Sequence, residues 1–168
     1  GLAAKATGTP LIIHEQNAIA GMSNRYLAKL ATKVLQAFPN TFGDSESPEN
    51  PKLETVGNPV RDAICKIPAP EERYDLSDDS PLKLLVVGGS LGAEALNKTV
   101  PAALAQIDKP IAVYHQCGRN NLASTQNNYG PVDRTVHNVT VKPFIDDMAD
   151  AYAWADVIVC RAGALTVT

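Results

Sequence analysis

The segment KLLVVGGSLGAEALN, residues 83–97, constrains the fold more than any other part of the chain. An unbroken apolar run, Leu84 to Val87, stands directly before two glycines and a stretch of helical composition. Parallel strands that are covered on both faces need such a run, and glycines let the backbone turn without a clash at Cβ. The segment therefore predicts a buried strand that enters a helix through a tight turn.

This predicted turn is a candidate phosphate site. It contains Gly88, Gly89, Ser90 and Gly92, and free N–H groups at the start of a helix attract an anion together with the helix dipole. The spacing matches neither common nucleotide fingerprint, because Ser90 replaces the second glycine of G-x-G-x-x-G and no G-K-[ST] lysine follows. A tight strand–helix turn without a ligand is the alternative.

Strands and helices alternate regularly after residue 82. The predicted strands are 83–87, 111–116, 136–142 and 156–160, and the predicted helices are 93–106, about 119–128, and 146–153. Such alternation is typical of an α/β fold with a doubly wound parallel sheet. Ligands bind beyond the carboxyl ends of the strands in these sheets. Three candidate segments follow predicted strands and are expected to share one crevice: Gly88–Gly92, Phe144–Met148 and Arg161–Thr166.

The first third of the chain has a similar but less regular pattern. Residues 1–6 predict a helix, 10–14 a strand, 53–56 another strand, and the helix that begins near Gly21 is expected to give way to a strand near Lys33. Two polar, proline-rich stretches, 39–51 and 67–81, predict a loop and a surface connection.

Composition narrows the class of protein. Lys and Arg total 15 against 18 Asp and Glu, giving a net charge of -3, and no basic run indicates a nucleic-acid partner. The three cysteines are far apart, so neither a disulfide framework nor a zinc site is expected, and a reducing cytoplasm fits best. No apolar stretch approaches the roughly 20 residues that span a bilayer.

Two polar motifs in the first part of the chain are candidates for binding. HEQN, residues 14–17, gathers four polar side chains at a predicted strand end, although Asn17 is also suited to cap a helix. Arg61 follows the kink Gly57-Asn58-Pro59, from where a guanidinium can bind a diphosphate in a bidentate way. Taken alone, it is equally an ordinary surface arginine.

The end of the chain contains a second strand–helix turn, CRAGALTVT, residues 160–168. Ala164 to Thr166 would present free N–H groups to another anion, and a plain helix start is the alternative. His115 and His137 are interpreted as structural, because no serine or carboxylate stands at a telling spacing. Asp146 and Asp147 are expected to favour a helix start rather than to bind metal.

Taken together, five ordered motifs resemble the MurG family, bacterial enzymes that transfer N-acetylglucosamine from UDP-N-acetylglucosamine to undecaprenyl-diphosphate-muramoyl-pentapeptide. The resemblance implies the two-domain GT-B type of fold. Residues 1–60 would be the last part of the N-terminal, acceptor-side domain, and 61–168 most of the Rossmann-like donor domain, so the chain would be a fragment. The motifs are HEQNAIAG (14–21), GNPVR (57–61), VVGGSLGA (86–93), and FIDDMADAYAWADVIVC with RAGALT (144–166).

The resemblance also implies roles for individual residues toward UDP-GlcNAc. Asn17 would contact the sugar region, Arg61 and Ser90 the diphosphate, and Ile145 the uracil through its backbone. Ala164, Leu165 and Thr166 would contact the nucleotide and sugar. The family's proposed catalytic histidine and its ribose-binding glutamate have no counterpart in these residues, so no catalytic residue is assigned and the isolated fragment is expected to be inactive. His14 is only a weak substitute for the base.

The reaction implied by the resemblance is inverting glycosyl transfer to the C4 hydroxyl of the muramoyl sugar of lipid I, giving lipid II for peptidoglycan synthesis and thus for cell shape and division. No cofactor and no bound metal are expected. Because lipid I is membrane-bound, the enzyme would be peripheral on the cytoplasmic face of the inner membrane. Arg25, Lys29 and Lys33 would attract anionic lipid, or would simply form a solvated helix face.

Two other classes of function are alternatives to a glycosyltransferase. A non-catalytic nucleotide-binding or interaction module would use the same glycine turns and stays open. An NAD-dependent oxidoreductase needs an acidic residue at a strand end about 20 residues after the glycine turn. Asp108 instead precedes its predicted strand, which argues against that class.

Overall fold

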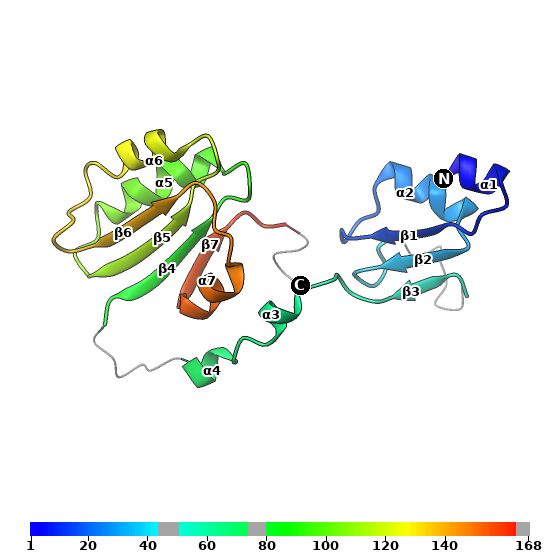
Figure 1. Cartoon of the computed structure of the whole chain (residues 1–168), viewed down its shortest axis with the longest axis horizontal. Helices are drawn as coiled ribbons and strands as arrows, with labels where there is room; N and C mark the ends of the chain where they lie inside the picture. The colour runs from blue at the N-terminus through cyan, green and yellow to red at the C-terminus, as the bar shows by residue number, and fades with distance from the viewer. Residues whose placement is uncertain (44–50, 74–79, 164–168) are drawn as a thin grey trace. The chain divides into compact units, whose positions relative to one another are not determined.

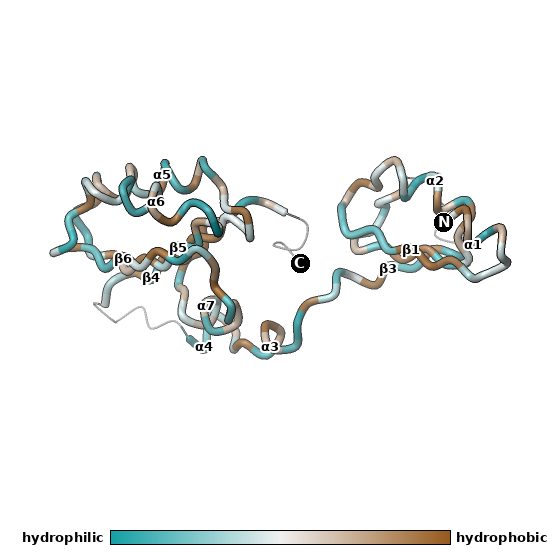
Figure 2. Tube along the Cα trace, turned by 45° about the horizontal axis from the view of Figure 1, so that its top comes forward, coloured by the Kyte–Doolittle hydropathy of each residue, from teal (hydrophilic) through white to brown (hydrophobic). Residues whose placement is uncertain are grey.

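The computed structural model describes residues 1–43, 51–73 and 80–163. The chain divides into two compact units, the first formed mainly by Gly1–Val60 and the second by Arg61–Arg161. Each unit is built on its own parallel sheet (Figure 1). Apolar residues recur along the strands of both sheets (Figure 2), as expected for strands that are covered by helices.

The first unit contains a three-stranded sheet in the order β1-β2-β3. Both pairs of strands are parallel, with Ile13 opposite Val34 and Val34 opposite Leu53. Its elements are α1 (Leu2–Ala6), β1 (Ile12–Glu15), α2 (Met22–Leu30), β2 (Lys33–Gln36) and β3 (Leu53–Thr55).

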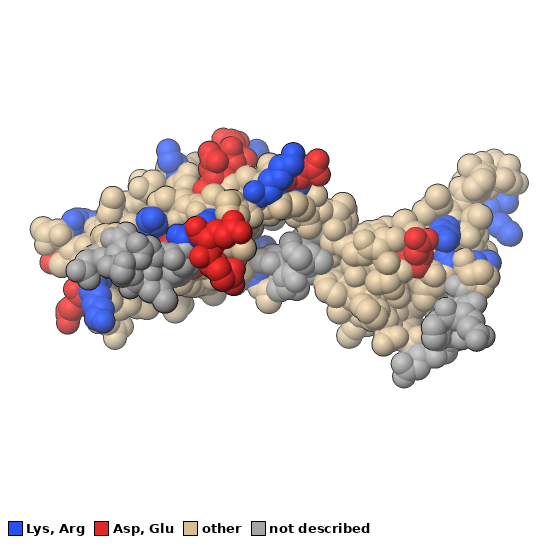
Figure 3. Space-filling view, turned by 90° about the horizontal axis from the view of Figure 1, so that it is seen from below, with Lys and Arg blue, Asp and Glu red and all other residues tan. Residues whose placement is uncertain are grey.

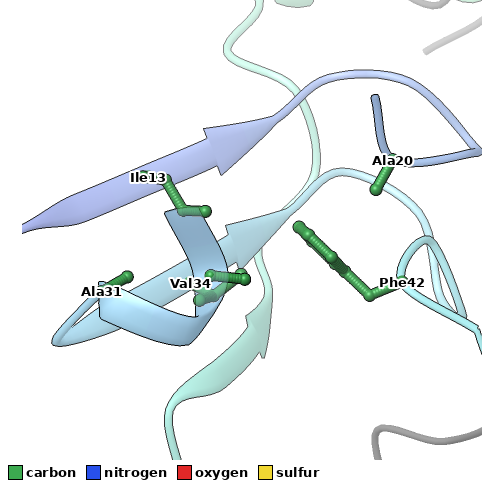
Figure 4. Close-up of a cluster of buried hydrophobic side chains, with 6 residues drawn as sticks. Ile13, Ala20, Ala31, Val34 and Phe42 are labelled. Atoms are coloured by element: carbon green, nitrogen blue, oxygen red, sulfur yellow. The ribbon is translucent and has the colours of Figure 1, made fainter. Parts of the chain in front are cut away.

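The core of the first unit lies between α2 and the sheet. Its buried side chains come from the strands, from α2 and from the two loops that flank them (Figure 4). The core is small, and four of its six buried members are the short or branched side chains of alanine and valine. These six are Ile13, Ala20, Ala28, Ala31, Val34 and Phe42.

The second unit contains a four-stranded sheet in the order β6-β5-β4-β7, and all of its strand pairs are parallel. The carboxyl ends of its strands therefore meet at one edge. Its strands are β4 (Leu82–Val87), β5 (Ile111–Gln116), β6 (Asn138–Lys142) and β7 (Val157–Cys160), and its helices are α3 (Asp62–Cys65), α4 (Pro70–Arg73), α5 (Glu94–Leu104), α6 (Leu122–Asn128) and α7 (Met148–Trp154).

Helices cover both faces of this sheet. Alternate residues of β4 point to opposite faces, so Val86 packs into a core with Leu104 of α5, while Leu85 packs with Ala151 of α7. Both β4 side chains are completely buried. The α/β architecture with a doubly wound parallel sheet that the sequence predicts is therefore present.

The described part of the connection 67–81 contains a helical turn that the sequence does not predict. It contains the one-turn helix α4, and α3 precedes it. Pro70 at the first helical position fits α4, since proline lacks only an N–H that has no partner there. Arg73 then donates from Nη1 to the carbonyl oxygens of Ala153, at 2.8 Å, and Ala155, at 3.3 Å, at the end of α7. The described residues of this segment are mostly exposed, so the predicted surface connection is confirmed.

Candidate functional site

The carboxyl edge of the second sheet brings together segments that are far apart in the sequence. Residues 88–93, 117–121 and 143–147 follow β4, β5 and β6, Arg161 follows β7, and these strands are all parallel. Ligands bind at this edge in parallel α/β sheets. The edge is therefore the candidate functional site.

The turn after β4 uses glycines at two positions where the backbone has positive φ. The Gly92 N–H donates to the Gly89 carbonyl oxygen at 3.0 Å, and the two glycines have φ of 80° and 84°. Ser90 is exposed inside this turn and precedes α5, which begins at Glu94. The N-cap residue Ala93 supplies no side-chain hydrogen bond. The first N–H groups of α5 thus lack the side-chain cap that many helices carry.

The loop after β5 packs tightly against this turn. A Cβ built on Gly92 would lie 2.0 Å from the Cys117 carbonyl oxygen, so no other residue fits there. Asn121 donates from Nδ2 to the Leu91 carbonyl oxygen at 3.0 Å and to that of Cys117 at 3.1 Å. The close packing and these two hydrogen bonds fix the turn in place.

A buried polar network lies below the turn. The Asn97 side chain donates to the Cys117 carbonyl oxygen at 2.9 Å and bonds His115 Nε2 at 3.0 Å. His115 Nδ1 bonds the Tyr129 hydroxyl at 2.9 Å. Burial lowers the pKa of His115 to about 4, and burial raises the pKa of Tyr129. His115 is thus a neutral structural residue, as its sequence context predicts.

Arg161 is the first residue of the predicted candidate segment Arg161–Thr166, but the sequence assigns no role to its side chain. Its Nη2 lies 3.1 Å from the position that a Cβ on Gly89 would take, so the guanidinium lies against the glycine turn. The sequence signal for a role of Arg161 is its position directly after the apolar strand β7. The turn therefore has a positive charge beside it in addition to the start of α5.

Ile145 lies after β6 and is anchored through both its side chain and its backbone. The side chain is buried with Leu85 and Ala151, and the N–H donates to Gln116 Oε1 at 2.9 Å. The neighbouring Phe144 ring lies 5.2 Å from the Arg119 guanidinium. Phe144 and Ile145 line a cavity of about 640 Å³ beside α7.

Arg61 is exposed and lies beside the start of α7. It lines a smaller cavity of about 350 Å³ together with Asp147 and Met148. Asp147 caps α7 by accepting the Asp150 N–H at 3.0 Å, the capping role that the sequence predicts. The structure thus brings Arg61 near the segment that follows Ile145.

In the first unit, Glu15 organises the loop that contains Asn17. Its carboxylate accepts the backbone N–H and the side-chain amide of Asn17, at 3.0 and 2.9 Å, and also bonds Gly21 and Asn24. Burial alone would raise the pKa of Glu15, but these hydrogen bonds together lower it to about 2. Asn17 does not cap α2, whose N-cap is Gly21.

The two polar motifs of the first unit lie side by side. His14 Nε2 bonds the Gly57 carbonyl oxygen at 3.0 Å, and Asn58 donates from Nδ2 to the Gln16 carbonyl oxygen at 3.1 Å. Because Nε2 faces a carbonyl acceptor, it carries the proton and does not serve as a base. The contact gives His14 a structural role and leaves it poorly suited as a substitute base.

The predicted site residues are therefore grouped as follows. Gly88, Gly89, Ser90 and Gly92 share one turn, and Arg61 and Ile145 lie in the same unit, whereas Asn17 belongs to the first unit. Ala164, Leu165 and Thr166 lie outside the described residues. Within the described ranges, no group of three or more His, Cys, Asp and Glu residues is arranged to hold a metal ion.

Comparison with family models agrees with this geometry. The glycosyltransferase family 28 C-terminal domain matches residues 83–168, just over half of the chain, and the family 28 N-terminal domain matches residues 1–36. The chain belongs to glycosyltransferase family 28. The match to the C-terminal domain begins in β4 and contains the whole carboxyl edge described above.

Curated relatives match this family 28 chain along its full length. Proteins of Psychrobacter cryohalolentis and Psychrobacter arcticus are 70% and 68% identical over 168 residues. A protein of Acinetobacter baumannii is 51% identical over 170 residues. All three are named UDP-N-acetylglucosamine--N-acetylmuramyl-(pentapeptide) pyrophosphoryl-undecaprenol N-acetylglucosamine transferase. The chain spans less than half of their length, 46% for the first two and 45% for the third.

A solved structure supports the same fold. The crystal structure of Acinetobacter baumannii MurG superposes with a TM-score of 0.75 and 43% identity, covering 99% of this chain and 44% of that one. The expected GT-B type of fold and the resemblance to the MurG family are thereby confirmed. Among the described residues, no helix has the length and apolar character needed to cross a membrane.

Proposed function

We propose that this chain is part of an inverting glycosyltransferase that moves N-acetylglucosamine from UDP-GlcNAc to lipid I. The C4 hydroxyl oxygen of the muramoyl sugar attacks C1 of the donor, the bond from C1 to the diphosphate breaks, and UDP leaves. The hydroxyl proton passes to a base outside this chain. The observation that carries the proposal is 70% identity, along the whole chain, to a relative with that name.

The carboxyl edge of the second unit suits the departing diphosphate. The leaving group gains negative charge as the bond to C1 breaks, and fixed dipoles and cations stabilise that charge. The uncapped start of α5, the turn around Ser90 and the Arg161 guanidinium supply both at one place. Arg61, exposed in the same unit, adds a further cation that can bind a diphosphate.

Further site residues are assigned within this proposal. The Ile145 backbone contacts uracil, Ala164, Leu165 and Thr166 contact the nucleotide and sugar, and Asn17 contacts the donor sugar region. The Asn17 loop is held by Glu15, so its side chain needs no large rearrangement before binding. Preorganised polar groups of this kind reduce the free-energy cost of binding.

The proposal assigns a different role to each unit. Residues 1–60 belong to the acceptor-side domain and 61–168 to the donor domain. The division of the chain near Val60 and Arg61 supports this boundary. The family matches, to the N-terminal domain over 1–36 and to the C-terminal domain over 83–168, support the order of the two domains.

A membrane-facing role of the whole enzyme, on the cytoplasmic leaflet where lipid I lies, is supported by the surface of α2. Met22 and Tyr26 are 75% and 66% exposed, one helical turn apart. They line a shallow cavity with Arg25, Lys29 and Phe42. Exposed apolar side chains flanked by cations are typical of helices that bind an anionic membrane surface.

The donor site is tested by calorimetric titration of the chain with UDP-GlcNAc, UDP and NAD. We expect UDP and UDP-GlcNAc to bind and NAD not to bind. Binding should weaken at least tenfold in Arg161→Met, because the variant removes a charge-assisted contact to the diphosphate. Absence of UDP binding would contradict a donor site in this chain, and equal binding of NAD would favour a general dinucleotide site.

A further inference from the structure

The side chain of Gln116 is a buried amide at the end of a strand. Gln116 is the last residue of β5, its exposed fraction is 3%, and the other residues of β5 that point to the same face are Ala112 and Tyr114. Its neighbours across the sheet are Val87 of β4 and Lys142 of β6. A glutamine is seldom buried so fully, so its side chain requires a specific partner.

That partner is the segment that follows β6. The Ile145 N–H donates to Gln116 Oε1 at 2.9 Å, in a bond that is itself buried. The Gln116 backbone contacts the other half of the candidate site, because its carbonyl oxygen accepts the Gly88 N–H at 3.4 Å. One residue therefore joins the start of the glycine turn to the segment that contains Ile145.

The hydrogen bond matters because residues 143–147 form neither helix nor strand. Without the ladder of a sheet, the position of the Ile145 backbone depends on a few contacts. These are its side chain in the core beside α7 and the bond to Gln116. The Phe144 ring beside Arg119 supports the outer side of the same segment.

We propose that Gln116 is a positioning residue that sets the Ile145 backbone for recognition of the nucleotide base. This inference rests on the proposed function, in which the donor is a uridine diphosphate. The Gln116 side chain acts on the base-binding segment, whereas its backbone acts on the phosphate-binding turn. Substitution of the side chain should therefore change selectivity among bases while the turn keeps its shape.

The test compares UDP with CDP, which share the ribose and diphosphate and differ in the base. Titration calorimetry gives the ratio of the two dissociation constants for the chain and for Gln116→Met, which keeps the length of the side chain and removes the acceptor. We expect UDP binding to weaken about tenfold, as for loss of one buried hydrogen bond, and the preference for UDP to shrink at least fivefold. Gln126→Met, at an exposed position on α6, is the matched control and should leave the ratio unchanged.

Loss of folded protein alone would weaken the binding of UDP and of CDP by the same factor. The ratio of the two dissociation constants therefore separates an effect on positioning from an effect on stability. Gln116→Glu keeps an acceptor for the Ile145 N–H and should preserve most of the preference, which keeps the test open if the methionine variant fails to fold. An unchanged ratio in the folded methionine variant, or a parent chain that does not distinguish UDP from CDP, would overturn the role of Gln116. A parent chain that binds neither nucleotide would instead contradict the proposed function.

Discussion

Buried ionisable side chains in this chain are held in one protonation state by their surroundings. Glu15 stays charged because four N–H groups surround its carboxylate, although burial opposes that charge. His115 stays neutral because burial disfavours its cation. Neither side chain is free to exchange a proton near neutral pH, so each stabilises the structure of its own unit rather than take part in chemistry.

The Glu15 carboxylate should contribute stability that depends on pH. Its pKa is lowered from 4.5 to about 2, so the contribution is full above about pH 5 and is lost as the pH falls toward 2. We expect Glu15→Gln to destabilise the first unit by about 3 kcal/mol at pH 7, from the size of this shift. The difference from the parent chain should shrink at pH 3.

The measurement is urea unfolding at both pH values, followed by the amide NMR signals of β1 and β2. Glu54→Gln is the matched control. Glu54 forms only an exposed pair with Lys33 at 2.8 Å, so its removal should cost less than about 1 kcal/mol. A Glu15→Gln effect that is the same at pH 7 and pH 3 would disprove the linkage.

The sequence is least informative about the roles of individual residues. It predicts that Gly88 to Gly92 and the loop at Asn17 are candidate binding segments, because glycines and clustered polar residues follow apolar strands. It assigns no role to the side chains of Gln116 and Arg161, since their partners, Ile145 and the turn at Gly89, are distant in the sequence. Such pairings depend on which strands become neighbours, which composition and spacing do not determine.

At the scale of elements, the sequence predicts all seven described strands, with bounds that differ by at most two residues. The unbroken apolar run 84–87 predicts a buried parallel strand, and β4 is one. The similar run 157–160 forms the edge strand β7, whose Val157 and Ile158 are exposed. The one-turn helices α3 and α4 were missed, since four residues are too few for helical periodicity to be visible. They are held by tertiary contacts instead, of which those of Arg73 are the clearest.

Arg73 should stabilise the second unit by satisfying the carbonyl groups at the end of α7. Its Nη1 donates to Ala153 and Ala155, and its Nε donates to the Pro68 carbonyl oxygen at 3.0 Å. We expect Arg73→Met to destabilise this unit by about 1.5–3 kcal/mol, the range for hydrogen bonds that involve a charged group. Fluorescence of Trp154, the only tryptophan of the chain, reports urea unfolding of this unit.

The control for this variant is Lys98→Met. Lys98 pairs with Glu94 on the exposed surface of α5, and the loss of such a pair costs less than about 1 kcal/mol. Arg73→Lys should recover only part of the stability, because an ammonium group does not reproduce the guanidinium geometry. Equal midpoints of urea unfolding for the Arg73→Met and Lys98→Met variants would show that the contacts of α4 with α7 do not stabilise this unit.

At the scale of the whole molecule, the sequence predicts the fold class from alternation and the family from the order of five motifs. The match to two family 28 domains agrees with both. On the face of the second unit seen in Figure 3, Lys and Arg are scattered and interspersed with Asp and Glu. The cations visible on that face thus form no continuous basic surface. The basic and apolar surface of α2 belongs to the first unit.

The surface of α2 should let the chain bind anionic membranes. We expect co-sedimentation with vesicles that contain about one third anionic lipid, and weaker binding at high salt, since attraction to anionic lipid is screened. The double variant Met22→Ser, Tyr26→Ser should bind at least tenfold more weakly, because it removes two exposed apolar side chains. Ile107→Ser, at a 40% exposed position in the second unit, is the control. Unchanged binding of the double variant would exclude α2 as the contact.

The interlocking of Gly92 with the loop after β5 has an evolutionary consequence. A Cβ on Gly92 would strike Cys117, and a Cβ on Gly118 would lie 2.4 Å from the Leu91 carbonyl oxygen, so each loop forbids a side chain in the other. Selection for folding alone would therefore retain these glycines in a descendant that no longer binds nucleotide. Ser90 is exposed and Arg161 lies only beside the turn, so packing constrains them less. Among distant relatives, those two positions, rather than the glycines, would distinguish a working transferase from a surviving scaffold.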